Sequence, residues 1–394
     1  MVGLRTQFVH LYVKDNTEES DGKFEDYGIY TQVEQLNKTA LKSHGLDSNG
    51  QLYKINSFEF YRYEDIIKKE DDAGYDKTAF EKMLEIKGDS DHTKLIDMLT
   101  DLNDYSIGIE DVLKEHFDEE NIVYWMAFQI LMGNVDTQNR NVYLYSPLNS
   151  DIWYFIAWDN DGCLMRSEYE LKNFSDQGSW EKGISNYWGN VLFQRCLKSR
   201  SFREKLNDAI LELREYLNKD MLISKIESYK NVLKPYLYSM PDAEYEPLTS
   251  EQYDQIVASL PDEIEKNYKL YLESLETPMP FYIGVPTIDG NKLKFNWDVS
   301  YDLDAEDITY SVEVARDYLF QDVIYHNTTL TVPETEMDLP EAGQYFVRIR
   351  ATNTSGKTQD AFDYYVTDEG KHYGMKCFYI TEDSTVEEDN YEEG

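Results

Sequence analysis

Residues 132–162 constrain this chain most, because two acidic turns flank a pair of short apolar runs there. Before them, residues 122–131 are apolar except for one glutamine, which predicts a buried helix. The runs Val142–Tyr145 and Ile152–Ile156 are rich in β-branched and aromatic residues, and a Ser-Pro-Leu-Asn-Ser-Asp turn joins them. This pattern predicts a β-hairpin, which would fold the second acidic turn back beside the first.

The two turns carry Asp136 and Asn141, then Asp159 and Asp161. Carboxylates and a carboxamide form a hard, oxygen-rich site that suits Mg²⁺ or Mn²⁺ better than zinc or copper. We expect Asp159 to be the main metal ligand and Asp161 an auxiliary one. Residues of these types also cap helices and close turns, and for Asp161, which precedes Gly162, a turn-closing role is an equal alternative.

The order of Asp136, four residues, Asn141, a hairpin and an aspartate at a strand end is the layout of protein-kinase catalytic loops. Together with the flanking motifs, it resembles the CotH family of spore-coat and secreted kinase-like proteins over about residues 7–275. The flanking motifs are Asn134, Tyr143-Leu144-Tyr145 and Trp158-Asp159-Asn160-Asp161-Gly162.

The resemblance implies an α+β, protein-kinase-like domain over residues 1–276, with a mainly helical C-terminal lobe. It also implies transfer of the γ-phosphate of ATP to Ser or Thr of a protein substrate, with Mg²⁺ (or Mn²⁺) as cofactor. Asp136 would act on the acceptor hydroxyl, and Asn141 and Asp159 would hold the metal ion.

Residues 7–13 and 28–34 alternate like strands and predict a hairpin with a long acidic tip. By the resemblance, this hairpin ends a kinase-type N-terminal lobe and places Glu34 at the hinge, beside the adenine; an ordinary surface charge is an equal alternative. Lys54 matches a lysine after the hinge and is a candidate nucleotide or phosphate contact, although an exposed strand-end lysine is the commoner case. The family's glycine loop and phosphate-binding lysine would precede Met1, so the chain is either an N-terminally truncated member with an incomplete N-terminal lobe or a degenerate one. We therefore expect weak Mg-ATP binding and slow transfer or none.

The C-terminal part changes from a helical to an alternating pattern. Helices are predicted over residues 191–217, 222–237 and 250–275, with a linker at 277–280. Residues 281–380 alternate with period two and resemble a fibronectin type III module, which implies a seven-strand sandwich and contact with a cell surface or polysaccharide. Residues 381–394 are acidic, and we expect a disordered tail.

Composition limits the classes of partner. The chain of 394 residues has a formal net charge of −38, which argues against a nucleic-acid or anionic-membrane surface. No run of apolar residues is long enough to span a membrane, and residues 1–5 are no signal peptide. Because we expect the chain to begin inside a domain, an extracellular or spore-surface location still fits best. The three cysteines and six histidines show no metal-binding spacing.

Two rivals to the kinase interpretation remain. The first is an inactive kinase-like scaffold or surface-binding protein, and the second is a metal-dependent hydrolase using the same carboxylates. The second is the weaker, because no histidine or glutamate base stands at a suitable spacing.

Overall fold

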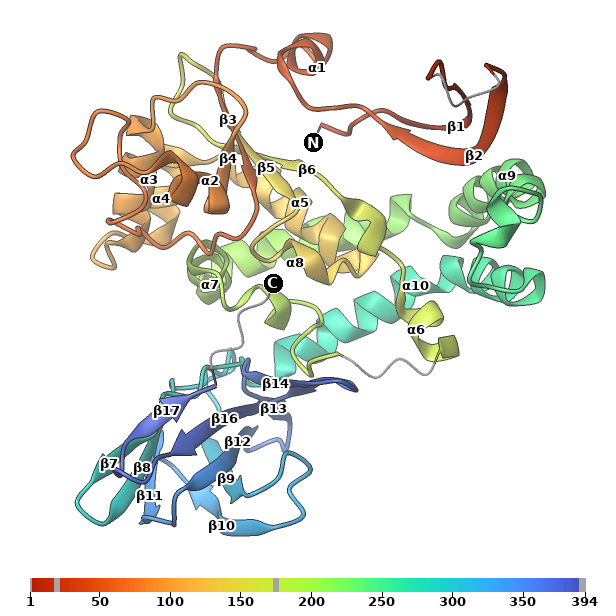
Figure 1. Cartoon of the computed structure of the whole chain (residues 1–394). Coiled ribbons are helices and arrows are strands. Elements are labelled where there is room, and N and C mark those ends of the chain that lie inside the picture. Colours follow the sequence, from red (N-terminus) through yellow and green to blue (C-terminus); the bar gives the residue numbers. More distant parts are fainter. Residues whose placement is uncertain (1, 18–21, 173–176, 390–394) are drawn as a thin grey trace. The chain divides into compact units, whose positions relative to one another are not determined.

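The computed structural model describes residues 2–17, 22–172 and 177–389 (Figure 1). It divides into two compact units. Unit 1 comprises Met1–Lys172 and Asn190–Asn267, and unit 2 comprises Asn173–Gly189 and Tyr268–Gly394. Each unit has its own sheet or sheets, as the mixed α+β expectation requires.

A four-stranded antiparallel sheet, in the order β4-β3-β5-β6, forms the centre of unit 1 (Figure 1). Its strands are β3 (Gln51–Ile55), β4 (Leu84–Ile86), β5 (Val142–Ser146) and β6 (Tyr154–Ala157). Every residue of β5 is buried, which explains why the run lacks the alternation of a strand with one wet face. The predicted hairpin over β5 and β6 is confirmed.

Helix α5 (Glu119–Met132) is the predicted buried helix, and it packs against β6 on one side and α8 (Arg200–Tyr216) on another. The Asp118 carboxylate caps its start by accepting a hydrogen bond of 2.9 Å from the Asn121 backbone N–H. The Asn121 side chain in turn forms two hydrogen bonds with Phe155. Its Nδ2 donates to the Phe155 carbonyl at 3.1 Å, and its Oδ1 accepts from the Phe155 backbone N–H at 2.6 Å. Helix α5 is therefore fixed to the edge of the sheet.

The remaining helices follow the predicted apolar periodicity, with one break. Where one helix was expected over residues 191–217, Ser199 separates two, because its hydroxyl accepts from the Phe202 backbone N–H at 3.3 Å and starts a new helix. The helices are α1 (Lys38–Ser43), α2 (Lys77–Met83), α3 (Thr93–Asn103), α4 (Ile109–His116), α6 (Arg166–Lys172), α7 (Val191–Lys198), α9 (Lys219–Leu237) and α10 (Ser250–Glu276).

The predicted N-terminal hairpin is confirmed as β1 (Thr6–Lys14) and β2 (Phe24–Val33). It forms a two-stranded sheet of its own and does not join the central sheet. The Asp242 carboxylate accepts from the Ile29 backbone N–H at 3.1 Å, and the Phe8 ring meets the Tyr229 ring edge-on at 5.9 Å. These contacts attach the hairpin to the region of α9.

Unit 2 is built mainly from strands. One sheet has the order β10-β9-β12-β16-β17, with β13 also paired to β12; a second has the order β11-β8-β7, and β14 pairs with β15. Apolar side chains of both larger sheets, among them Leu293, Trp297 and Val347, belong to a single buried core. The strands are β7 (Thr287–Asp289), β8 (Lys292–Asn296), β9 (Ile308–Ala315), β10 (Val323–Leu330), β11 (Glu334–Asp338), β12 (Gly343–Asn353), β13 (Thr358–Asp360), β14 (Tyr364–Thr367), β15 (Gly370–Tyr373), β16 (Met375–Ile380) and β17 (Val386–Glu388).

Two features of unit 2 differ from expectation. Residues Val386–Glu388 of the expected disordered tail pair with β16, where Lys376 also lies 3.3 Å from the Glu388 carboxylate; residues 390–394 lie outside the described part. In addition, the division between the units falls at Asn267, ahead of the predicted linker, and residues 173–189 belong to unit 2. The Trp180 ring packs against Phe362 at 5.1 Å, which accounts for that assignment.

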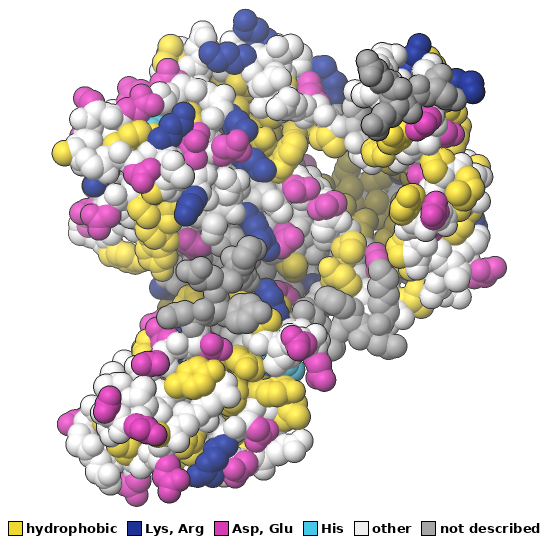
Figure 2. Space-filling model, in the orientation of Figure 1, with side chains coloured by type: hydrophobic (Ala, Val, Ile, Leu, Met, Phe, Trp, Pro, Cys, Tyr) yellow, Lys and Arg dark blue, Asp and Glu magenta, His cyan; other side chains and the backbone are white. Residues whose placement is uncertain are grey.

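Acidic side chains are scattered over both units on the face shown in Figure 2. In the described part of the chain, none of the helices combines the length and the apolar character that crossing a membrane requires.

Candidate active site

The two acidic turns meet at one end of the central sheet's strands, which we call the sheet edge. Val142, the first residue of β5, pairs with Ile55 at the end of β3 and with Ala157 at the end of β6. Asn141 immediately precedes this row of paired residues, and Asp159 follows it by two positions. The side chains that leave this edge therefore start from neighbouring strands, as predicted.

The first turn begins where α5 ends. Gly133 has the left-handed backbone, with φ of 66°, that commonly terminates a helix, and Asn134 accepts a hydrogen bond of 3.3 Å from the Asp136 backbone N–H. Asp136 lies in a short 3₁₀ turn, Val135–Thr137, and its side chain is 48% exposed. The Arg140 guanidinium donates to the Asp136 carboxylate at 2.7 Å. Asp136 is thus accessible to a substrate but carries a cationic neighbour.

Asn160 joins the second turn to the first. Its side-chain oxygen accepts from Gln129 Nε2 at 3.2 Å and from Asn134 Nδ2 at 3.4 Å. The Leu164 backbone N–H also donates to the Met132 carbonyl at 2.8 Å. Asn141 and Asp159 both have left-handed backbones, with φ of 57° and 55°, a conformation that Asn and Asp adopt more readily than other non-glycine residues and that is common in turns.

Electrostatics show which charges share the site. Asp159 is exposed, yet partial desolvation of its carboxyl raises its pKa from the usual value, and the neighbouring Asp161 carboxylate raises this pKa further. The Lys54 ammonium lowers the Asp159 pKa, and the more distant Asp136 charge raises it. Lys54 also lies 5.9 Å from the centre of the Trp158 ring. The structure therefore brings Asp136, Asp159, Asp161 and Lys54 into one electrostatic group.

This group fits a hard divalent cation. The donors are carboxylate and carboxamide oxygens, and the Asp161 carboxylate raises the pKa of Asp159, so a cation between them would favour the ionised form of Asp159. The carboxylate oxygens of Asp136, Asp159 and Asp161 do not, however, all lie within 4.8 Å of one another. Among the described residues, a different group of side chains meets that distance. Asp159 and Asp161 are the better-placed pair, because Asp161 is the charged group with the largest effect on the Asp159 pKa.

The contacts of Glu34 do not connect it to this acidic group. Its carboxylate lies 2.7 Å from His44 Nε2, accepts from the Arg5 backbone N–H at 3.1 Å and from the Ser43 hydroxyl at 3.4 Å. The hydrogen bond with His44, followed by that with Arg5, lowers the Glu34 pKa. These contacts tie the end of β2 to α1.

Cys163 follows the second turn but has the character of a packing residue. Burial raises the pKa of its thiol to about 12, and the nearby Asp161 carboxylate adds to that effect. A thiol with so high a pKa is a poor nucleophile at neutral pH.

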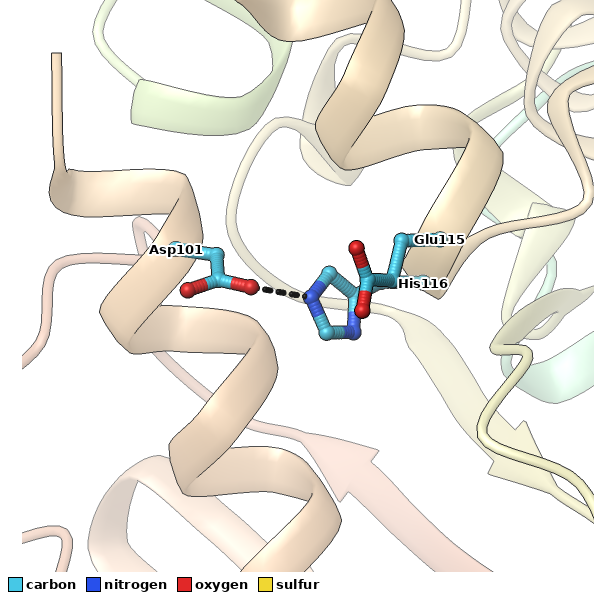
Figure 3. A group of neighbouring side chains, drawn as sticks. All are labelled: Asp101, Glu115 and His116. Carbon is cyan, nitrogen blue, oxygen red and sulfur yellow. Dashed lines mark hydrogen bonds and ion pairs between the residues drawn. The ribbon is translucent and has the colours of Figure 1, made fainter. Parts of the chain in front are cut away.

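The further group with metal-ligand proximity lies between α3 and α4 (Figure 3). His116 is buried, and its Nε2 lies 2.8 Å from the carboxylate of Asp101, while Glu115 is exposed. The ligand atoms of these three residues lie within 4.8 Å of one another, but exposed acidic groups such as Glu115 are common without a metal ion. The arrangement fits an ion pair between two helices.

Sequence reasoning identified the acidic residues but not the side chains that hold them. The sequence did not predict the hydrogen bond between Gln129 and Asn160, because this pairing depends on how the turns meet in space. Arg140 did give one, since it stands four residues after Asp136 and immediately before Asn141.

The fold and the candidate site together define a class of protein, a mixed α+β chain with an oxygen-rich acidic site at a sheet edge. Residues 1–271 match the family described as CotH kinase protein, so the chain belongs to the CotH kinase family. Membership in a kinase family implies the use of ATP and a protein substrate.

Other comparisons add little. No curated protein matches this chain. Among solved structures, the surface layer protein SbsC, domains 1–6, is similar at 12% identity with a TM-score of 0.14; the match covers 84% of this chain and 41% of that one. The chain thus spans less than half the length of that structure.

Proposed function

We propose that this chain transfers the γ-phosphate of ATP to a Ser or Thr hydroxyl of a surface or spore-coat protein. One observation carries the proposal: Asp159 shares its electrostatic surroundings with Asp161, Lys54 and Asp136 at the sheet edge where Asn141 also lies. A phosphoryl-transfer site needs these elements, which are metal ligands, a phosphate-directed cation and a carboxylate for the acceptor hydroxyl.

Asn141 and Asp159 would hold Mg²⁺ or Mn²⁺, with Asp161 as an auxiliary ligand. Such an ion, when bound, neutralises charge that develops on the phosphate oxygens. The raised pKa of Asp159, caused first by desolvation and then by the Asp161 charge, supports this role because a bound cation would offset both effects.

Asp136 would orient the acceptor hydroxyl and take its proton. Its half-exposed position allows a protein substrate to reach it. Arg140 donates a hydrogen bond to the Asp136 carboxylate. During transfer, its guanidinium would also lie near the phosphate and stabilise its charge.

Lys54 is the proposed nucleotide or phosphate contact, since its ammonium lowers the pKa of Asp159 and lies over the Trp158 ring. Glu34 is the weaker of the two proposed nucleotide contacts, because His44 and Arg5 already engage its carboxylate. Its backbone, at the end of β2, remains the proposed hinge.

A scaffold is the second candidate, and the pairing of Asp136 with Arg140 favours it. In that case unit 2, which has eleven strands (β7–β17) in its described residues where a seven-strand fibronectin type III-like sandwich was expected, would attach the chain to a cell surface or polysaccharide.

Thermal unfolding with Mg-ATP tests the site. Mg²⁺ or Mn²⁺ together with ATP should raise the melting temperature of the wild-type chain, because a ligand of the native state stabilises it. Asp159→Asn should abolish the shift, whereas Asp208→Asn, which removes an exposed carboxylate from α8, should keep it. An unchanged shift in Asp159→Asn would show that the metal assignment is wrong.

A further inference from the structure

A pocket separate from the acidic group lies along β5 and β6 and includes the hairpin end of these strands. It is a pocket of about 860 Å³, within the size range of small-molecule sites. Tyr145 and Tyr154, which face each other across the hairpin, line it. Tyr145 stands three residues after Val142, roughly 10 Å along the strand.

Aromatic rings form part of the pocket wall and are held in place. The rings of Tyr145 and Tyr154 have centroids 6.3 Å apart. The Tyr145 hydroxyl donates to the Asp47 carbonyl at 3.1 Å, and the Tyr124 hydroxyl donates to the Glu212 carboxylate at 2.5 Å. A wall of this kind offers π faces and apolar edges to the aliphatic part of a ligand.

Four carboxylates from three separate segments line the same pocket, and none of its lining residues is lysine or arginine. They are Asp47 from the loop after α1, Asp118 and Glu120 at the start of α5, and Glu212 on α8. Hydrogen bonds from the backbone of Asn49 and then of Leu148 lower the Asp47 pKa, which keeps that carboxylate ionised at neutral pH. The pocket is therefore both apolar and negatively charged.

This combination selects a ligand with several cationic groups on an aliphatic stem. The methylene groups of such a ligand cover tyrosine rings while its ammonium groups meet carboxylates. Because the carboxylates come from three separate segments, ammonium groups spaced along one chain can meet several of them at once, which a single lysine side chain or a compact metal ion cannot do.

We propose that this pocket is a binding site for a free aliphatic polyamine. The inference does not depend on phosphoryl transfer, since none of the lining residues belongs to the group around Asp159. It applies equally to an active kinase and to a scaffold.

Isothermal titration of the full chain with spermidine tests the proposal, in about 150 mM NaCl so that long-range charge is screened beyond roughly 8 Å. Spermidine should bind saturably, and the double variant Glu120→Gln, Glu212→Gln should weaken binding by at least about tenfold. Tyr154→Leu, which keeps an apolar wall, should weaken it about threefold.

The matched control is Asp208→Asn with Glu215→Gln, which removes the same charge from exposed positions of α8 outside the pocket. Its affinity should stay within about twofold of the wild type. Equal losses in both double variants, or no saturable binding, would overturn the proposal. Tighter binding of a trilysine peptide than of spermidine would also overturn it, in favour of docking by a protein segment.

Discussion

The Arg140 guanidinium lies 2.7 Å from the carboxylate of Asp136, four residues earlier in the same turn. Both side chains are about half exposed, at 50% and 48%, so water screens the pair. An exposed pair of this kind contributes little to stability, and replacing either partner should leave the fold intact. Asp136 can therefore be tested for chemistry without the complication of unfolding.

Arg140→Gln and Asp136→Asn should each change the free energy of unfolding by less than about 0.5 kcal/mol. Urea denaturation followed by circular dichroism measures this quantity. A loss of several kcal/mol in either variant would mean that the ion pair is structural, and the site assignment of Asp136 would lose its support.

The Asp159 carboxyl should make stability depend on pH in a specific direction. Its folded-state pKa is raised by partial desolvation and by Asp161, so its ionisation disfavours the folded state at neutral pH, and stability attributable to it increases as pH falls through that pKa. In the absence of divalent cations, Asp159→Asn should therefore be more stable than the wild type at neutral pH. Melting temperatures measured across the acidic range in EDTA should converge as the wild-type carboxyl becomes protonated; a variant less stable at neutral pH contradicts this account.

Gly133 has little tolerance for a side chain. A Cβ at this position would lie 2.6 Å from Asn267 Nδ2, and Asn267 is buried and bonded to the Leu131 carbonyl at 3.0 Å and to Arg166 Nε at 2.6 Å. Gly133→Ala should thus destabilise unit 1 by about 1–3 kcal/mol, from backbone strain and displacement of Asn267. Gly290→Ala, at a left-handed turn with open space around it, is the control for strain alone, and equal losses in both variants would exclude a role for Asn267.

The contact between His116 and Asp101 should behave as an ion pair between helices and not as a metal site. His116→Ala should lower the free energy of unfolding by about 1–3 kcal/mol, because a buried hydrogen bond is lost. Exposed Glu115→Gln should have almost no effect, and EDTA should leave the melting temperature unchanged. A drop in melting temperature with EDTA that His116→Ala abolishes would instead identify a bound metal ion.

Local patterns in the sequence predicted the elements that carry the site, because helix α5 and the β5–β6 hairpin each have a distinct periodicity and clear turn residues. Contacts between distant segments were not predictable in this way. The pairing of β3 with β5 and the bridge from Asn160 to Gln129 depend on tertiary packing, which leaves no fixed spacing in the sequence.

The same distinction explains the differences elsewhere. Ser199 divides an otherwise continuous helical pattern because one hydroxyl caps α8, a local event that apolar periodicity does not report. Glu34 forms its contacts with His44 and Arg5 only after β2 and α1 are placed, so its role at a hinge could not be judged from the strand that precedes it.

The central claim, Mg-dependent transfer of phosphate that requires Asp136, is tested most directly with ATP labelled on its γ-phosphate. Label should appear slowly on the chain itself or on a Ser/Thr-rich acceptor such as dephosphorylated casein, should require Mg²⁺ or Mn²⁺, and should persist in Asp208→Asn. Asp136→Asn should lower the rate by at least about 100-fold, the usual contribution of a positioned base. Transfer that survives in Asp136→Asn would contradict the claim, and complete absence of transfer from the folded wild-type chain would favour the scaffold.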